Sequence, residues 1–283
     1  MPTNLYFTSL NLTNQIILGV FLVIMAFIIL RYSFKMFEMG YVMTYKKPLY
    51  NHFYITLKKL DNHQKDILKK QFSFYNKLTE KEKKFFEHRL ASFIKDKDFI
   101  GREGLNVTDE MIVLISATAV MLTFGFRDFY IGLISKIVIY PKKFFSNSNN
   151  TYHKGEFNPR LGALVLSWED FKQGFAIEND NLNLGIHEIT HAIHLNSMKE
   201  RDVSSTIFSD SFKELSLLLS TNHNLKDNLL ASHYFRNYAF TNQFEFLAVA
   251  IENFIETPKD FKAQFPEVYN KIKQMLNFNT AGY

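Results

Sequence analysis

Residues 183–191 read Asn-Leu-Gly-Ile-His-Glu-Ile-Thr-His and contain the pattern His-Glu-x-x-His. Residues four apart lie on one face of a helix, one turn above each other, so His187 and His191 can direct two imidazole nitrogens at one ion. Zinc is the usual ion for this pattern, and Glu188 is placed to act as general base on a water at the metal. The alternative is a pair of core histidines whose hydrogen bonds are satisfied without a metal.

Length and composition limit the classes of protein that fit. A chain of 283 residues is long enough for one domain of ordinary size plus an appendage, and its 30 Phe and 14 Tyr provide ample core material. The chain has no cysteine, which excludes a disulfide framework, a cysteine nucleophile and a thiolate metal site. A metal in this protein must therefore be held by histidine and carboxylate side chains.

The net charge of +5 is distributed unevenly along the chain. Residues 1–30 carry no charged side chain, whereas residues 31–100 carry 16 Lys and Arg against 8 Asp and Glu. The rest of the chain is therefore slightly acidic. Nucleic acid also attracts basic segments, but nothing here resembles a recognition helix or an aromatic RNA-binding strand. We interpret the basic segment as membrane-proximal and expect no nucleic-acid partner.

The fifteen residues 16–30 are apolar without interruption. Extension on either side reaches the roughly 20 residues that a membrane span needs, and the segment lacks the early positive charge and cleavage site of a signal peptide. We expect a single transmembrane helix over about residues 12–35, within an N-terminal anchor of residues 1–45. Basic residues follow this segment, which predicts a single-pass protein of the cell (inner) membrane with a cytoplasmic domain of residues 46–283. The lipid bilayer is then one partner.

The remaining pattern predicts an α+β fold. Strands are expected at residues 136–140 and 161–168, before the histidine motif, and helices dominate after it. The strongly apolar residues 111–125 are a candidate second membrane span, but polar residues bracket and interrupt them, so a buried central helix is preferred. Thr79, Thr108 and Thr241 are expected to cap helices. A final amphipathic helix is expected at residues 261–276.

Two imidazoles do not complete a catalytic zinc site, which has three protein ligands and a water. The metzincin pattern would need a glycine and a third histidine after His191, and the chain has His194 and Ser197 at those places. Glu245 lies in a later apolar helix where an unpaired carboxylate would be costly to bury. Glu252 shares its face and can orient a ligand. From the residues alone, Glu245 is equally well explained as a carboxylate favoured by a helix N-terminus.

The chain resembles the MtfA (Mlc titration factor A) family of zinc peptidases, peptidase family M90, over roughly residues 75–275. Single matching stretches are weak apart from the histidine motif, but their order and spacing together are specific. They are residues 99–105 (FIGREGL), 108–111 (TDEM), 137–141 (IVIYP), 162–170 (GALVLSWED), 187–191 (HEITH), 238–239 (YA), 245–249 (EFLAV) and 252–254 (ENF).

This resemblance implies a zincin-like domain, with a small sheet and helices around the active-site helix. It implies one zinc ion held by His187, His191 and Glu245, with Glu188 as general base and Tyr238 as a hydrogen-bond donor to the developing oxyanion. It also implies a peptide or protein substrate, added by backbone pairing to a strand near the cleft. That strand comprises Ala163, Leu164, Val165, Leu166 and Ser167.

The chain departs from the family pattern at three places. It has His194 where the family has aspartate, no glycine in residues 196–200, and an additional hydrophobic N-terminus. His194 is expected to support the site or the fold rather than to bind metal. Two alternatives to a membrane-anchored metallopeptidase stay open: a regulatory protein that sequesters a transcriptional repressor, and a structural zinc protein with His194 as fourth ligand.

Overall fold

The computed structural model describes residues 11–146, 150–177 and 179–283. The chain divides into two compact units, one ending at Tyr45 and one from Lys46 to Tyr283. The first unit is α1 (Leu12–Tyr45), a helix of 34 residues whose side chains are exposed from residue 12 to residue 37. An 18-residue window of α1 has a mean hydropathy of 2.5, and α1 is the one helix in the described residues long and apolar enough to cross a membrane.

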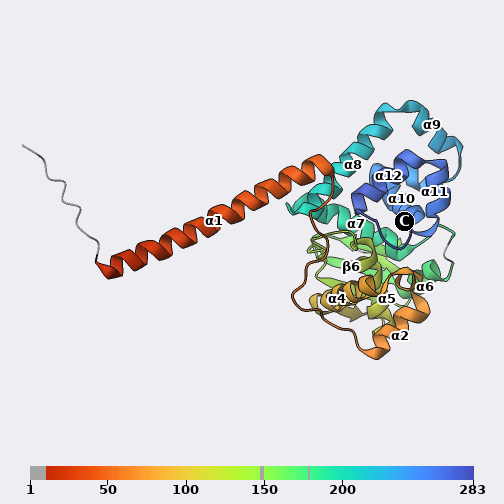
Figure 1. Ribbon diagram of the computed structural model, residues 1–283. Coiled ribbons are helices and arrows are strands. Elements are labelled where there is room, and N and C mark those ends of the chain that lie inside the picture. The colour runs from red at the N-terminus through yellow and green to blue at the C-terminus, as the bar shows by residue number, and fades with distance from the viewer. Residues whose placement is uncertain (1–10, 147–149, 178) are drawn as a thin grey trace, which may run out of the picture. The chain divides into compact units, whose positions relative to one another are not determined.

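The second unit is helix-rich (Figure 1). Before the histidine motif its helices are α2 (Asn62–Gln71), α3 (Ser73–Lys77), α4 (Glu80–Asp96), α5 (Asp109–Leu122) and α6 (Trp168–Ala176). The motif lies on α7 (Leu184–Lys199). The later elements are α8 (Val203–Thr221), α9 (His223–Ala231), the 3₁₀ helix η1 (Asn237–Phe240), α10 (Gln243–Glu256), α11 (Pro258–Gln264) and α12 (Pro266–Leu276).

A small mixed sheet precedes α7 in the chain. Its strands, in spatial order, are β1 (Asp98–Gly101), β2 (Lys136–Tyr140), β6 (Ala163–Ser167) and β5 (Gly155–Asn158). β1, β2 and β6 are parallel, whereas β5 pairs antiparallel with β6, placing Gly155 opposite Leu166 and Asn158 opposite Ala163. A separate hairpin joins β3 (Phe144–Ser146) to β4 (Thr151–His153). The expected mixture of a small sheet and many helices is confirmed.

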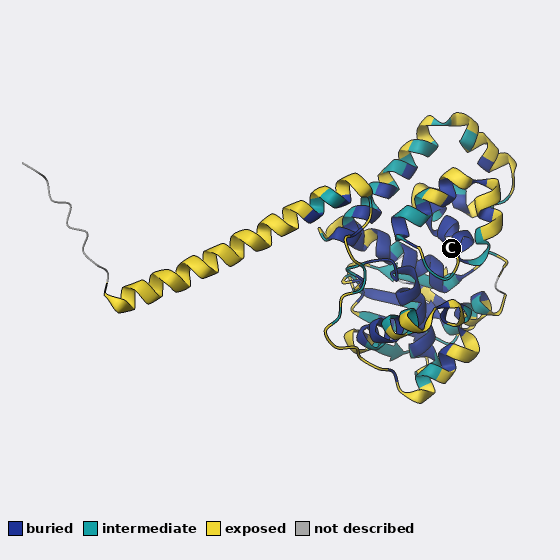
Figure 2. Cartoon of the chain, in the orientation of Figure 1, coloured by how far each residue is buried: buried dark blue, intermediate teal, exposed yellow. Residues whose placement is uncertain are grey.

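The core of the second unit forms around α5 and α7. α5 is buried along most of its length and packs against α2, α4 and α7 (Figure 2). The prediction of a buried central helix is therefore confirmed. α7 also contacts α6, α8, α10, β5 and β6, so both the sheet and the C-terminal helices surround it. This central position fixes the motif in the interior of the unit.

Several local expectations are confirmed and others need correction. Thr79 and Thr108 cap α4 and α5 as expected, but α10 is capped by Asn242, whose side-chain oxygen accepts from the backbone N–H groups of Phe244 and Glu245, and not by Thr241. The expected final helix is two helices, because Pro266 cannot continue α11 and instead begins α12. Residues 99–101 of the family-matching segment 99–105 form the end of β1, because β2 provides a pairing partner.

Candidate metal centre

The helix α7 is fixed at its start by its own sequence. Asn183 caps it, since its side-chain oxygen accepts from the Ile186 N–H at 3.1 Å. Gly185 permits close packing, because a Cβ atom there would lie 2.5 Å from the ring of Phe171 on α6. α7 can therefore pack tightly against α6, with His187 one turn into the helix.

Three ligand atoms from two helices converge beside α7. The Nε2 atoms of His187 and His191 are 3.2 Å apart. A carboxylate oxygen of Glu245, in the first turn of α10, lies 3.0 Å from His187 Nε2 and 3.5 Å from His191 Nε2. These residues form a group whose ligand atoms all lie within 4.8 Å of one another. The structure therefore brings together the two motif histidines and the later glutamate.

A second carboxylate binds the His187 ring at Nδ1, the nitrogen that faces away from the converging ligand atoms. Glu252, also on α10 and almost fully buried, lies 2.6 Å from His187 Nδ1. Because an ionised carboxylate only accepts hydrogen bonds, Nδ1 donates to it and Nε2 of a neutral His187 presents a lone pair to the converging group. The Glu252 carboxylate also accepts from both terminal guanidinium nitrogens of Arg236, at 2.7 and 2.9 Å, and from the Asn183 backbone N–H at 2.9 Å.

The electrostatics of the group favour positive charge at its centre. Burial lowers the pKa of His187, but hydrogen bonds with Glu245 and Glu252 outweigh burial and raise this pKa to about 9. Burial raises the pKa of Glu245, but hydrogen bonds with both histidines outweigh it and hold that pKa well below its ordinary value. A metal ion that displaces the proton of His187 would meet the two Nε2 lone pairs and the Glu245 carboxylate. A divalent cation suits this set of donors, which is the nitrogen and oxygen set that zinc accepts.

Glu188 is buried beside the group, and β5 passes directly over it. A Cβ atom on Gly155 would lie 2.6 Å from Glu188 Cγ, so only glycine allows this approach. Burial raises the pKa of Glu188, while the neighbouring His187 and His191 oppose the shift. A raised pKa makes the ionised carboxylate a stronger base, which suits a residue that takes up and returns a proton.

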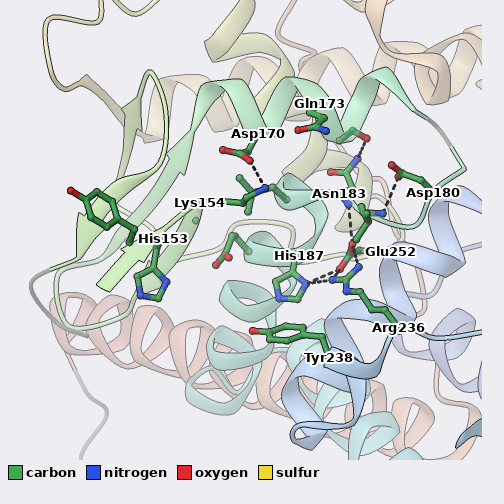
Figure 3. A pocket seen from close by; sticks show the side chains of 16 residues that line it. His153, Lys154, Asp170, Gln173, Asp180, Asn183, His187, Arg236, Tyr238 and Glu252 are labelled. Carbon is green, nitrogen blue, oxygen red and sulfur yellow. Dashed lines mark hydrogen bonds and ion pairs between the residues drawn. The ribbon is translucent and has the colours of Figure 1, made fainter. Parts of the chain in front are cut away.

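His187, Glu188 and Gly155 are among the residues that line a cleft of about 370 Å³ (Figure 3). His187, Arg236, Tyr238 and Glu252 line one side, and Lys154 and Asp170, paired at 2.6 Å, lie on the other. The ring of Tyr238 is half exposed and lies 5.9 Å from the ring of His187. Burial, followed by the charge of Glu245, raises the pKa of Tyr238 to about 12. The Tyr238 hydroxyl therefore keeps its proton and can donate a hydrogen bond.

His194 lies outside the group of ligand atoms. Its ring is buried among aromatic side chains, packing edge-on against Phe212 at 4.2 Å and Phe244 at 5.1 Å. Burial lowers the pKa of His194 to about 4, so the ring is neutral at physiological pH. We interpret His194 as a residue that packs within this aromatic cluster, and its role stays a prediction.

The expected substrate strand, Ala163–Ser167, needs correction. This strand is β6, which pairs with β2 on one side and with β5 on the other, so neither edge is free to pair with a peptide. Arg236 and Gly155 were both missed from the sequence. Arg236 stands two residues before Tyr238, but no local pattern links it to Glu252 sixteen residues later. Gly155 begins the short strand β5, and nothing near it in sequence indicates its contact with Glu188.

Comparison with known proteins assigns the chain to a family. The family model described as glucose-regulated metallo-peptidase M90 matches residues 48–277. The chain therefore belongs to the M90 peptidase family, whose members are metallopeptidases, and the resemblance drawn from the motifs is confirmed. A relative from Synechocystis sp., an uncharacterised protein, is 23% identical over 237 residues, which cover 76% of this chain and 83% of the relative.

Proposed function

We propose that this chain is a zinc-dependent metallopeptidase that hydrolyses peptide bonds, with one zinc ion held by His187, His191 and Glu245. The observation that carries the proposal is the convergence of the ligand atoms of these three side chains within 4.8 Å, beside an open cleft that His187 and Glu188 line. Three protein ligands leave one position open, as in catalytic rather than structural zinc sites. Glu252 orients the His187 ring through Nδ1, and Arg236 holds the Glu252 carboxylate in place.

Each group at the site has a separate role in the hydrolysis of a peptide bond. A bound zinc ion supplies Lewis acidity, which polarises the scissile carbonyl and makes water a better nucleophile. The Glu188 carboxylate removes the proton from the attacking water and delivers it to the leaving amine nitrogen. The Tyr238 hydroxyl donates a hydrogen bond to the oxygen of the former carbonyl as negative charge develops there.

We further propose that an extended peptide pairs with β5 and not with β6. The outer edge of β5 has no strand partner among the described residues, and its first residue, Gly155, lies against Glu188. Backbone pairing along this edge would direct a peptide bond toward the general base. An active-site helix beside a mixed sheet with a free antiparallel edge supports a zincin-like arrangement.

We also propose that α1 anchors the protein in the cell (inner) membrane as a single span. Its length and apolar composition suit a span, and basic residues lie in its C-terminal half at positions 31 and 35 and beyond its end at positions 46, 47, 58 and 59. The positive-inside rule then places the peptidase domain in the cytoplasm.

The test is a pair of measurements on the full chain and on Glu188→Gln. Both proteins are expected to hold about one zinc ion by elemental analysis. Turnover of peptide or chromogenic substrates should fall by about 10²–10⁴ in the variant, because it loses the proton acceptor. Glu169→Gln, an exposed glutamate on α6, is the matched control and should keep full turnover. Unchanged turnover in Glu188→Gln would remove the general-base role, and loss of zinc would make Glu188 a ligand.

A further inference from the structure

Residues 46–59 (KKPLYNHFYITLKK), here called the interfacial loop, follow α1 directly in the chain and belong to the second unit. The loop contains no helix or strand. The chemistry of the metal centre uses none of its residues. Its side chains divide into one set that binds the domain and one set that faces away from it.

The inward set is held firmly. Arg89, fully buried on α4, donates from Nε to the Tyr54 hydroxyl at 2.6 Å and from Nη2 to the Asn51 carbonyl at 2.9 Å. The ring of His52 stacks on Phe85 at 4.7 Å. The Lys58 N–H donates to His88 Nδ1 at 2.9 Å. Contacts of this number give the loop a defined conformation, so its outward face is also defined.

The outward set is unusually apolar for an exposed loop. Ile55 is 93% exposed and Phe53 is 75% exposed. Leu49, Tyr50 and Leu57 are also exposed. Single exposed apolar residues are common, but five within nine residues of an ordered loop mark an interaction surface.

Charge identifies the partner that this surface fits. Residues 46–59 contain four lysines and no acidic residue, and the lysines stand in pairs at the two ends of the apolar stretch. Lys46 pairs with Asp210, whereas Lys47, Lys58 and Lys59 are exposed and have no ion pair within the part of the chain that the structure describes. Apolar and aromatic residues flanked by free lysines suit the headgroup region of an anionic bilayer.

We propose that the interfacial loop inserts the side chains of Phe53 and Ile55 into the surface of an anionic membrane, with Lys47, Lys58 and Lys59 on the lipid headgroups. This inference extends the proposed membrane anchoring and does not depend on the peptidase activity. It adds a second membrane contact that belongs to the catalytic domain itself and follows the span immediately in sequence.

The absence of cysteine allows a direct test on the full chain. Single cysteines replace Ile55, Ile24 in α1, and Leu217, an exposed apolar residue on α8 that serves as matched control. Each protein is labelled with a nitrobenzoxadiazole fluorophore and reconstituted in vesicles of phosphatidylcholine with phosphatidylglycerol. Quenching by doxyl-labelled lipid should be about threefold or more stronger at position 55 than at position 217, and quenching by aqueous iodide correspondingly weaker.

The charge contribution has its own variant. Lys58→Glu with Lys59→Glu, or vesicles of phosphatidylcholine alone, should reduce lipid quenching at position 55 by about twofold or more. Equal iodide quenching at positions 55 and 217 would overturn the proposal. Protection at position 55 from both quenchers would indicate a protein contact and would also overturn it. The label at position 24 tests the anchor separately. Lipid quenching at position 24 without lipid quenching at position 55 would overturn the proposal for the interfacial loop and support the transmembrane span.

Discussion

Arg236 connects three parts of the candidate centre through one guanidinium group. It donates to Glu252, which holds His187, and to the Asn181 carbonyl before α7, and it lies 5.9 Å from the Tyr238 ring. A planar fork that binds both carboxylate oxygens fixes the carboxylate more strictly than a single ammonium can. We interpret Arg236 as a positioning residue for His187.

Substitution of Arg236 by lysine should therefore weaken metal binding. Zinc affinity is expected to fall by about 10–100-fold, as for other partners of metal-binding histidines. Competition with a chromogenic chelator measures this change. The exposed Arg201→Lys is the control and should bind zinc as the wild type does. Equal affinities in the wild type and Arg236→Lys would show that the Glu252 carboxylate is fixed without the fork.

Gly155 gives a second prediction at the scale of one residue. In Gly155→Ala the added methyl group would lie 2.6 Å from Glu188 Cγ, so either β5 or the Glu188 side chain must move. Unfolding free energy should fall by about 1–3 kcal/mol, as for overpacked cores. Turnover should fall on the order of 10²-fold because the base is displaced. Gly132→Ala is the control, since its nearest neighbouring atom would be 3.6 Å away. Melting curves and steady-state kinetics that match this control would contradict the assigned contact.

At the scale of elements, the end of α10 holds the segment that leads into α7. The Glu256 carboxylate accepts from the Asn181 N–H at 2.8 Å and from the Asn183 side chain at 3.2 Å. Burial raises the pKa of Glu256 to about 7, and the hydrogen bonds only partly oppose it. In the unfolded chain the carboxyl ionises near its ordinary value of 4.5.

The folded state therefore keeps a proton that the unfolded state loses between these two pH values. This contribution to stability is complete below about pH 4.5 and disappears as pH rises through about 7. The melting temperature of Glu256→Gln relative to wild type should rise by about 2 °C or more between pH 5 and pH 8, equivalent to about 1 kcal/mol after solvent screening. Glu267→Gln, at an exposed position on α12, controls for the loss of one negative charge. A relative melting temperature that falls over this range would contradict the raised pKa.

At the scale of the whole molecule, all residues assigned to the centre lie in the unit from Lys46 to Tyr283. A chain of residues 46–283 should therefore bind one zinc ion and keep turnover within about twofold of the full chain, as expected for a domain with its own core. It should also leave the integral membrane fraction after carbonate extraction. Loss of zinc binding in this fragment, while the full chain retains it, would show that the peptidase domain needs α1.

The helix α1 and the short strands differ in how well a linear pattern predicts them. An uninterrupted apolar run predicts a long apolar helix, and α1 is such a helix, because backbone hydrogen bonds within a helix need no distant partner. The short strands were harder to predict. β1, β3 and β4 have three or four residues each, and strands of this length exist only because a partner pairs with them.

Several features of the protein depend only on residues that are near neighbours in the chain, and these could be predicted. The four-residue spacing of His187 and His191, the caps at Thr79 and Thr108, and the apolar core helix all follow from helix geometry and local hydrogen bonding. The motif order also pointed correctly to the M90 family.

Which distant groups meet depends instead on how the helices and strands pack together. In the folded chain Glu245 lies beside the two histidines, Arg236 beside Glu252 and Gly155 beside Glu188. The strand order also leaves β5, and not β6, at an edge of the sheet. These contacts join residues between 16 and 58 positions apart, or depend on the order of strands. The packing of α7 between the sheet and the C-terminal helices sets them, and no periodicity in the chain encodes that packing.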